Sequence, residues 1–293
     1  MNSAFAPAKI NLYLHVTGRR SDGYHLLDSL LVFANLGDQV DVAESEHLSL
    51  EIVGPFAQGL SDGEDNLVLR AARSLADSAG IEPRAAIRLT KNLPVASGIG
   101  GGSADGAAAL RALIHHWQLT PKRDDLYRLA LSLGADVPAC FAGRPCYLGG
   151  IGEELTPAPA LPPACMVLIN PAVAVSTPDV FRARTAPFSR IARLETGPES
   201  GPETLGELVH ALSLRRNDLT DPAVKLAPEV SDVLGALTIS DGILLARMSG
   251  SGATCFGLYD DMNIAAAAAE HLQKDHPKWW VQATSILGAK TPP

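Results

Sequence analysis

The residues with the clearest chemical potential form a glycine run. Gly98, Gly100, Gly101 and Gly102 fall within five positions, directly before an alanine-rich stretch. Glycine costs roughly 0.5–1 kcal/mol relative to alanine inside regular structure, so this place in the chain favours backbone without side chains. The N-terminus of a helix carries partial positive charge and unpaired N–H donors, and glycines let a polyphosphate approach them closely. The pattern therefore indicates a phosphate-binding loop, with a flexible strand-to-helix connection as the alternative.

Two common phosphate-binding motifs do not fit this run. A Walker A loop needs a lysine directly before its hydroxyl residue, whereas no lysine stands here and Ser103 is followed by Ala104. The dinucleotide motif G-x-G-x-x-G would place its third glycine at Ser103 or at Asp105. We therefore interpret the run as a phosphate cradle that uses the positive end of a helix in place of a lysine.

These residues need a scaffold of strands and helices to position them. Apolar side chains alternate over 10–16, which predicts a strand, and 18–24 is a turn cluster. Further strands are predicted at 25–33, 38–44, 47–53 and 85–91, and helices at 65–80, 103–117 and 123–134. The second half predicts strands at 165–169, 243–249, 253–259 and 280–286, helices at 203–214, 223–237 and 263–274, a loop through Pro178 and a polar stretch over 185–203.

A proline-rich segment beginning at Pro157 predicts a boundary between two domains. The order of strands and helices after it is typical of a split β-α-β sandwich of the ferredoxin-like kind. The sequence therefore predicts an α+β protein with two domains, which span 1–157 and 158–293.

Composition excludes several classes of partner. The chain has 293 residues, is 46% hydrophobic and carries a formal net charge of -8. An acidic chain is a poor match for nucleic acids or anionic membranes, so neither is expected as a partner. The four cysteines have no zinc-binding spacing and read as reduced thiols. With no signal peptide or membrane-spanning stretch in the sequence, we expect a cytoplasmic protein.

Two further segments flank the glycine run toward the ends of the chain. They are PAKINLYLHVTGRRSDGYH, at 7–25, and MSGSGATCFGLY, at 248–259. Together the three segments resemble the three motifs of the galactokinase, homoserine kinase, mevalonate kinase and phosphomevalonate kinase (GHMP) superfamily. The first segment is most similar to the branch formed by the 4-diphosphocytidyl-2-C-methyl-D-erythritol kinases of the non-mevalonate isoprenoid pathway.

This resemblance covers nearly the whole chain and implies both a fold and a reaction. The implied fold is the two-domain GHMP kinase fold, with an N-terminal domain like the second domain of ribosomal protein S5 and a ferredoxin-like C-terminal domain. The implied reaction uses ATP and Mg²⁺ to phosphorylate the 2-hydroxyl of the methylerythritol moiety in a cytidine diphosphate-linked substrate. A monomer or weak homodimer is expected.

The resemblance also implies roles for individual residues. Asp136 matches the catalytic aspartate, which accepts the proton of the attacking hydroxyl, and Lys9 matches the catalytic lysine, which stabilises developing negative charge. The implied ATP-binding residues are Pro94, Val95, Ala96, Ser97, Gly98, Ile99, Gly100, Gly101, Gly102, Ser103 and Ala104. The implied substrate-binding residues are Asn11, Tyr24 and His25 from the first motif, with Thr177 and Phe181 from the second half. No residue is assigned as a metal ligand.

Each role competes with a plainer reading of the same residue. Asp136 could cap a turn after Gly134, Lys9 could be a solvated lysine, and Gly250 and Gly252 could form a hairpin without chemistry. Asn11 could cap a turn, Tyr24 could pack on a strand, and Thr177 and Phe181 could belong to an ordinary loop.

The sequence departs from the family pattern at one position of the cradle. Ala104 stands where the family's glycine motif has a second serine. Another GHMP kinase, acting on homoserine or mevalonate, is the alternative function, and a catalytically silent relative is the alternative outside enzymes.

Overall fold

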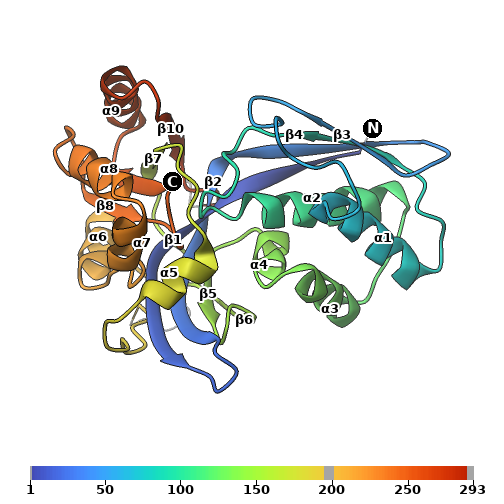
Figure 1. Ribbon diagram of the computed structural model, residues 1–293, viewed down its shortest axis with the longest axis horizontal. Coiled ribbons are helices and arrows are strands. Elements are labelled where there is room, and N and C mark those ends of the chain that lie inside the picture. Colours follow the sequence, from blue (N-terminus) through green and yellow to red (C-terminus); the bar gives the residue numbers. More distant parts are fainter. Residues whose placement is uncertain (1, 195–200, 289–293) are drawn as a thin grey trace. The chain divides into compact units, whose positions relative to one another are not determined.

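The computed structural model describes residues 2–194 and 201–288, which form two compact units (Figure 1). Unit 1 comprises the chain up to Ala8, Leu36–Val95 and Gly100–Gly143. Unit 2 comprises Lys9–Asn35, Ala96–Ile99 and the chain from Arg144 onward. The glycine run therefore contributes residues to both units.

Unit 1 is a sheet with helices packed beside it (Figure 1). Its strands are β3 (Ser49–Val53), β4 (Ala86–Thr90) and the ends of β1 (Asn2–Arg19) and β2 (His25–Ala43), both of which continue into unit 2. Strand β4 pairs antiparallel with β2 and parallel with β3. The helices are α1 (Leu67–Ala79), α2 (Gly101–His116), α3 (Arg123–Leu133) and α4 (Val137–Ala142), and α2 packs against both α1 and α4.

Helix α1 shows how local sequence sets the elements of unit 1. Asn66 caps its start by accepting the Val68 N–H, and Gly80 ends it in the left-handed conformation. Its buried face carries Leu69, Ala72 and Leu75, which recur at helical spacing. The predicted helix over 65–80 is confirmed here.

Unit 2 contains the ferredoxin-like sheet. Its strands β7 (Cys165–Asn170), β8 (Leu245–Met248), β9 (Cys255–Tyr259) and β10 (Trp280–Ser285) are ordered β10-β7-β9-β8, with antiparallel neighbours. Helix α8 (Glu229–Thr238) packs on β8 and β9, and α9 (Met262–Asp275) packs on β7 and β10. The unit also holds β5 (Cys146–Gly149), β6 (Glu154–Pro157), α5 (Thr177–Ala183), α6 (Leu205–Ser213) and α7 (Thr220–Leu226). The predicted ferredoxin-like arrangement is confirmed.

Several predicted elements differ from the observed ones. The strands predicted at 25–33 and 38–44 are one strand, β2, because Gly37 lets the backbone approach β1: a Cβ there would lie 2.2 Å from the Ala6 carbonyl oxygen. The helix predicted at 223–237 is two helices, α7 and α8, because Pro228 disfavours helical conformation at Ala227. Elements β5, β6, α4 and α5 were not predicted.

Two features predicted from the sequence stay predictions. Part of the polar stretch over 185–203, at 195–200, lies outside the described residues. The predicted domain boundary near Pro157 stays a prediction, since each of the two units is made of several separate segments of the chain.

Across the described ranges, no helix has the length and apolar character needed to cross a membrane.

Candidate functional site

In unit 2, the glycine run packs directly on the loop between β8 and β9, which spans Ser249–Thr254 and is called here the β8–β9 loop. Gly98 has a φ of +75°, and a Cβ on it would lie 2.3 Å from the Gly252 carbonyl oxygen. Gly250 has a φ of +56°, and a Cβ on it would lie 2.7 Å from the Gly98 oxygen. The Thr254 N–H donates to the Ser97 carbonyl at 3.1 Å. Gly250 and Gly252 therefore belong to a hairpin loop, and the backbone of this loop packs against Gly98 of the glycine run.

Strand β1 brings Lys9 and Asn11 to the same place. The Lys9 backbone N–H donates to the Ile99 carbonyl at 2.9 Å, and Lys9 Nζ donates to Asn11 Oδ1 at 3.4 Å. The Asn11 backbone N–H donates to Ser249 Oγ at 3.0 Å, and its side chain donates to Ser29 Oγ at 2.8 Å. Lys9 is only 6% exposed, which excludes the solvated position considered for it. Residues of all three sequence motifs thus meet in unit 2.

Helix α5 presents Thr177 and Phe181 on one side, four residues apart. Thr177 Oγ1 lies 2.7 Å from Ser251 Oγ, so this helix joins the β8–β9 loop. Phe181 stacks on His25, with ring centroids 5.1 Å apart and an interplanar angle of 24°. Burial, with the nearby charges of Arg19 and Arg184, lowers the pKa of His25 and favours the neutral imidazole.

Tyr24 lies at the tip of the β1–β2 hairpin and is 61% exposed. It therefore does not pack on a strand, as the plainer reading of this residue would require. The ring of Tyr24 is therefore accessible to a ligand, and the next residue in the chain is His25.

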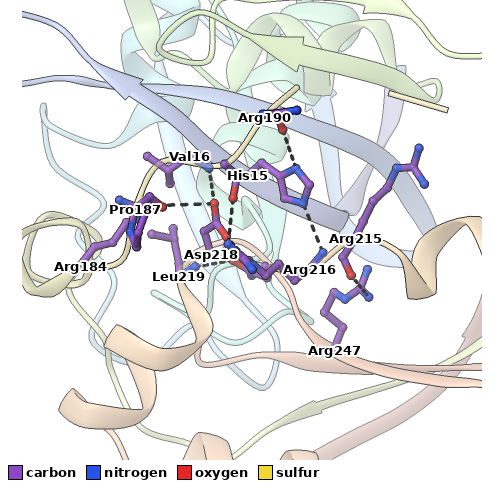
Figure 2. Close-up of polar contacts among 12 residues, drawn as sticks. His15, Val16, Arg184, Pro187, Arg190, Arg215, Arg216, Asp218, Leu219 and Arg247 are labelled. Carbon is purple, nitrogen blue, oxygen red and sulfur yellow. Dashed lines mark hydrogen bonds and ion pairs between the residues drawn. The ribbon is translucent and has the colours of Figure 1, made fainter. Parts of the chain in front are cut away.

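A polar network secures the far end of β1 (Figure 2). The Val16 N–H donates to Asp218 Oδ2 at 2.8 Å, and Arg216 Nε donates to Asp218 Oδ1 at 2.6 Å. His15 Nδ1 lies 3.1 Å from the Arg190 carbonyl oxygen, and its Nε2 accepts the Arg216 N–H at 3.3 Å. Burial raises the pKa of Asp218, but hydrogen bonds led by that from Arg216 outweigh it and leave the pKa lowered. The carboxylate therefore remains charged and holds β1.

Asn217, the neighbour of Asp218 in the chain, links this network to the end of β8 and to the β8–β9 loop by hydrogen bonds. Its side-chain amide donates to the Met248 and Gly250 carbonyl oxygens, each at 2.8 Å, and it is 6% exposed. Asn217, Ser249 and Ser251 were not among the site residues predicted from the sequence. The only signal for Asn217 was a run of polar residues, 215–218, between two predicted helices.

In unit 1, helix α2 begins inside the glycine run. Gly100 precedes it with a φ of 65°, and no side chain caps the start. A Cβ on Gly102 would meet nothing within 4 Å, so open space faces the first turn. Ser103 is half-buried, whereas Ala104 is completely buried. The residue that departs from the family pattern therefore lies on the packed side of the helix.

The remaining residues assigned to ATP flank these positions. Pro94 is buried and Val95 is 48% exposed. Ala96 has a φ of +51°, which a non-glycine residue rarely adopts. The segment thus turns sharply just before Gly98.

Asp136 stands at the start of α4, in unit 1, and is half-buried. Its side chain makes no capping hydrogen bond to this helix. Arg111 of α2 donates to the Cys140 carbonyl at 2.9 Å and ties α4 to α2.

Comparison with known proteins decides the family. Sequence models of the GHMP kinases N terminal domain and the GHMP kinases C terminal domain match residues 66–144 and 198–278. A 4-diphosphocytidyl-2-C-methyl-D-erythritol kinase of Paramagnetospirillum magneticum is 55% identical over 282 residues, which cover 96% of this chain and 97% of that one. The enzyme of the same name from Granulibacter bethesdensis is 53% identical, over 93% of this chain and 90% of its own. The chain belongs to the 4-diphosphocytidyl-2-C-methyl-D-erythritol kinase family.

Solved structures agree with this membership. A crystal structure of a 4-(cytidine 5'-diphospho)-2C-methyl-D-erythritol kinase has a TM-score of 0.76 and 35% identity, covering 98% of this chain and 100% of that one. A homoserine kinase from Cytophaga hutchinsonii has a TM-score of 0.73 at 19% identity, covering 97% of this chain and 94% of its own, and shares the fold. The two-domain GHMP kinase fold predicted for this chain is therefore confirmed.

Proposed function

We propose that this chain transfers the γ-phosphoryl group of ATP to the 2-hydroxyl of 4-diphosphocytidyl-2-C-methyl-D-erythritol. The observation that carries this proposal is 55% identity, over 96% of the chain, to a relative whose name states that substrate. The oxygen–phosphorus bond to ADP breaks, a bond to the acceptor oxygen forms, and the hydroxyl proton passes to a base. Positioning and charge stabilisation supply most of the catalysis in such transfers.

The start of α2 suits the phosphates of ATP. Its uncapped N–H groups, its positive helix end and the open space at Gly102 form a cradle that a larger side chain would fill. Residues Pro94 to Ala104 are the proposed ATP-binding segment. Mg²⁺, when bound, neutralises phosphate charge. Among the described residues no group of three or more His, Cys, Asp or Glu side chains is arranged to hold a metal ion, and no residue of this chain is assigned as a ligand of Mg²⁺.

Lys9 and Asp136 are the proposed catalytic pair. The Asp136 carboxylate stands at the start of α4 and has the chemistry to accept the acceptor's proton. The Lys9 ammonium is held by Asn11 in a buried position, where a cation stabilises developing negative charge strongly.

The cytidine end of the acceptor is proposed to bind near His25. Neutral His25, stacked on Phe181, offers one donor and one acceptor nitrogen to a base edge. Tyr24 offers an exposed ring for stacking, and Asn11 and Thr177 complete the proposed contacts. A cytoplasmic location, a monomer or weak homodimer, and domains spanning 1–157 and 158–293 are part of the same proposal.

A coupled assay of ADP release tests this function. Purified protein with ATP and Mg²⁺ is offered the cytidine diphosphate-linked acceptor, homoserine and mevalonate in parallel. We expect turnover with the first acceptor alone. Turnover with homoserine or mevalonate instead would keep the fold but remove the proposed roles of Tyr24 and His25, and no turnover with any acceptor would favour a silent relative.

Asp136→Asn tests the proton acceptor within the same assay. We expect kcat to fall about 100-fold or more, because an amide cannot take the proton. The dissociation constant for ADP, measured by calorimetry, should stay close to that of the unchanged protein. Undiminished kcat would exclude Asp136 as the base.

A further inference from the structure

A buried charged cluster in unit 1 lies beside the glycine run and is absent from the proposed mechanism. It consists of Lys91, Asp38 and Asp105, whose side chains are 3%, 0% and 5% exposed. Lys91 Nζ donates to Asp105 Oδ2 at 2.7 Å and also to Asp38 Oδ2. Charged side chains this deeply buried are costly and persist only when paired.

The cluster connects the two sides of the glycine run. Asp38 Oδ1 accepts the backbone N–H groups of Asn92 and Leu93, which lead into the run, at 2.5 and 2.8 Å. Asp105 stands in the second turn of α2, which leaves the run. A continuous chain of polar contacts thus passes from the incoming backbone, through Asp38 and Lys91, to the outgoing helix.

Gly101 shows that this chain reaches the start of α2. A Cβ on Gly101 would lie 3.1 Å from Lys91 Nζ and 3.8 Å from Asp38 Oδ2. The lack of a side chain at this position therefore lets the ammonium group lie directly against the first turn of the helix. Gly102, the next residue, has no such neighbour within 4 Å.

We propose that Lys91, Asp38 and Asp105 form a clamp that positions the start of α2 for binding of the ATP phosphates. The inference rests on the proposed function, which places ATP at the glycine run. The three side chains are too deeply buried to touch substrate, so they act as positioning residues through the backbone. Donors fixed in advance bind phosphate better than donors that must be ordered on binding.

The clamp is tested with three variants, which are Asp105→Ala, Lys91→Met and Asp105→Asn. Asp105→Ala removes the acceptor of Lys91, whereas Asp105→Asn keeps a carbonyl oxygen there. We expect Asp105→Ala to raise the ADP dissociation constant and the KM for ATP about tenfold, with the acceptor KM changed less than about twofold. Lys91→Met should act in the same direction and more strongly, and Asp105→Asn should restore most of the affinity.

The matched control is Arg88→Gln, on strand β4, which ends directly before Lys91. Arg88 pairs with Glu51 at 2.9 Å, but both side chains are 59% exposed. This variant should bind ADP as the unchanged protein does. A clamp that only stabilised the fold would lower the melting temperature of Asp105→Ala and leave its ADP affinity intact, which would overturn the inference. If Lys91→Met does not fold, the two Asp105 variants still decide the question.

Gly102→Asp separates failure of the inference from failure of the proposed function. Its carboxylate would project into open space at the start of α2 and repel phosphate. Loss of ADP binding in Gly102→Asp, with normal binding in Asp105→Ala and Lys91→Met, would overturn the clamp alone. Normal binding in all three variants would overturn both the clamp and the placement of ATP at the glycine run.

Discussion

The glycine run is anchored differently at its two ends. Ala96–Ile99 belong to unit 2, where Gly98 packs on Gly252 of the β8–β9 loop and the bonds are between neutral groups. From Gly100 onward the chain belongs to unit 1, where the buried Lys91–Asp38 ion pair and the contact of Lys91 with Asp105 hold it. The first anchor depends on the absence of side-chain atoms, and the second depends on charge. The first should therefore respond to added volume, and the second to pH.

The largest effect is expected at the neutral anchor, from Gly98→Ala. The new Cβ would lie 2.3 Å from a backbone oxygen, at a φ of +75°. Overpacking and left-handed strain together should cost on the order of 3 kcal/mol or more. Urea denaturation measures this loss.

Gly102→Ala is the matched control for that stability measurement. Its Cβ would meet nothing within 4 Å, and the residue is helical. Its stability should stay within about 1 kcal/mol of the unchanged protein. Equal losses for the two variants would contradict the packing account of Gly98.

Asn217→Ala should weaken the same anchor less. It leaves two buried carbonyl oxygens, one at Met248 at the end of β8 and one at Gly250 in the β8–β9 loop, without their present donor. Removing a buried partner of this kind costs about 1–3 kcal/mol. Thermal denaturation measures the loss, and Ser213→Ala, which alters an exposed hydroxyl on α6, is the control. A loss no greater than that of the control would show that Asn217 does not support the loop.

The effect that separates the two anchors is a pH dependence at Asp105. Burial, together with the Asp38 carboxylate and against the attraction of Lys91, raises the pKa of Asp105 to about 8. From about pH 4, the ordinary aspartate value, up to about 8 the folded protein retains a proton that the unfolded chain has lost. This contribution to stability therefore falls as pH rises through that window and is lowest above it.

Asp105→Asn removes this titration. The melting temperature of the unchanged protein, relative to that of the variant, should fall between about pH 4 and about pH 8 and level off above that range. Gly98→Ala should show no such relative change over the same range. Parallel curves for the unchanged protein and Asp105→Asn would contradict the assignment of a raised pKa to Asp105.

The same contrast explains what the sequence could and could not predict. Caps and helical periodicity are local signals, so helix α1 was predictable from Asn66, Gly80 and the residues between them. The role of Gly37 was hidden, because glycine within an apolar run indicates a turn as readily as a close approach of two backbones. The break between α7 and α8 could have been predicted from Pro228, although one continuous helix was predicted there.

The pairings that build the site are tertiary and carry no local pattern. Lys91 and Asp38 are 53 positions apart, and Asn11 and Ser249 are 238 apart. No periodicity links such residues, so only the folded chain reveals the clamp and the support of the β8–β9 loop. The motif resemblance predicted the family and its candidate residues, whereas the roles of Lys9 and Asp136 stay predictions.

Phosphorus NMR of the reaction product tests the central claim most directly. The protein is incubated with ATP, Mg²⁺ and 4-diphosphocytidyl-2-C-methyl-D-erythritol, and the products are followed with time. We predict one new phosphomonoester signal on the acceptor for each ADP formed, with the cytidine diphosphate linkage intact. ADP formed together with inorganic phosphate, without a new phosphomonoester, would contradict the proposed reaction.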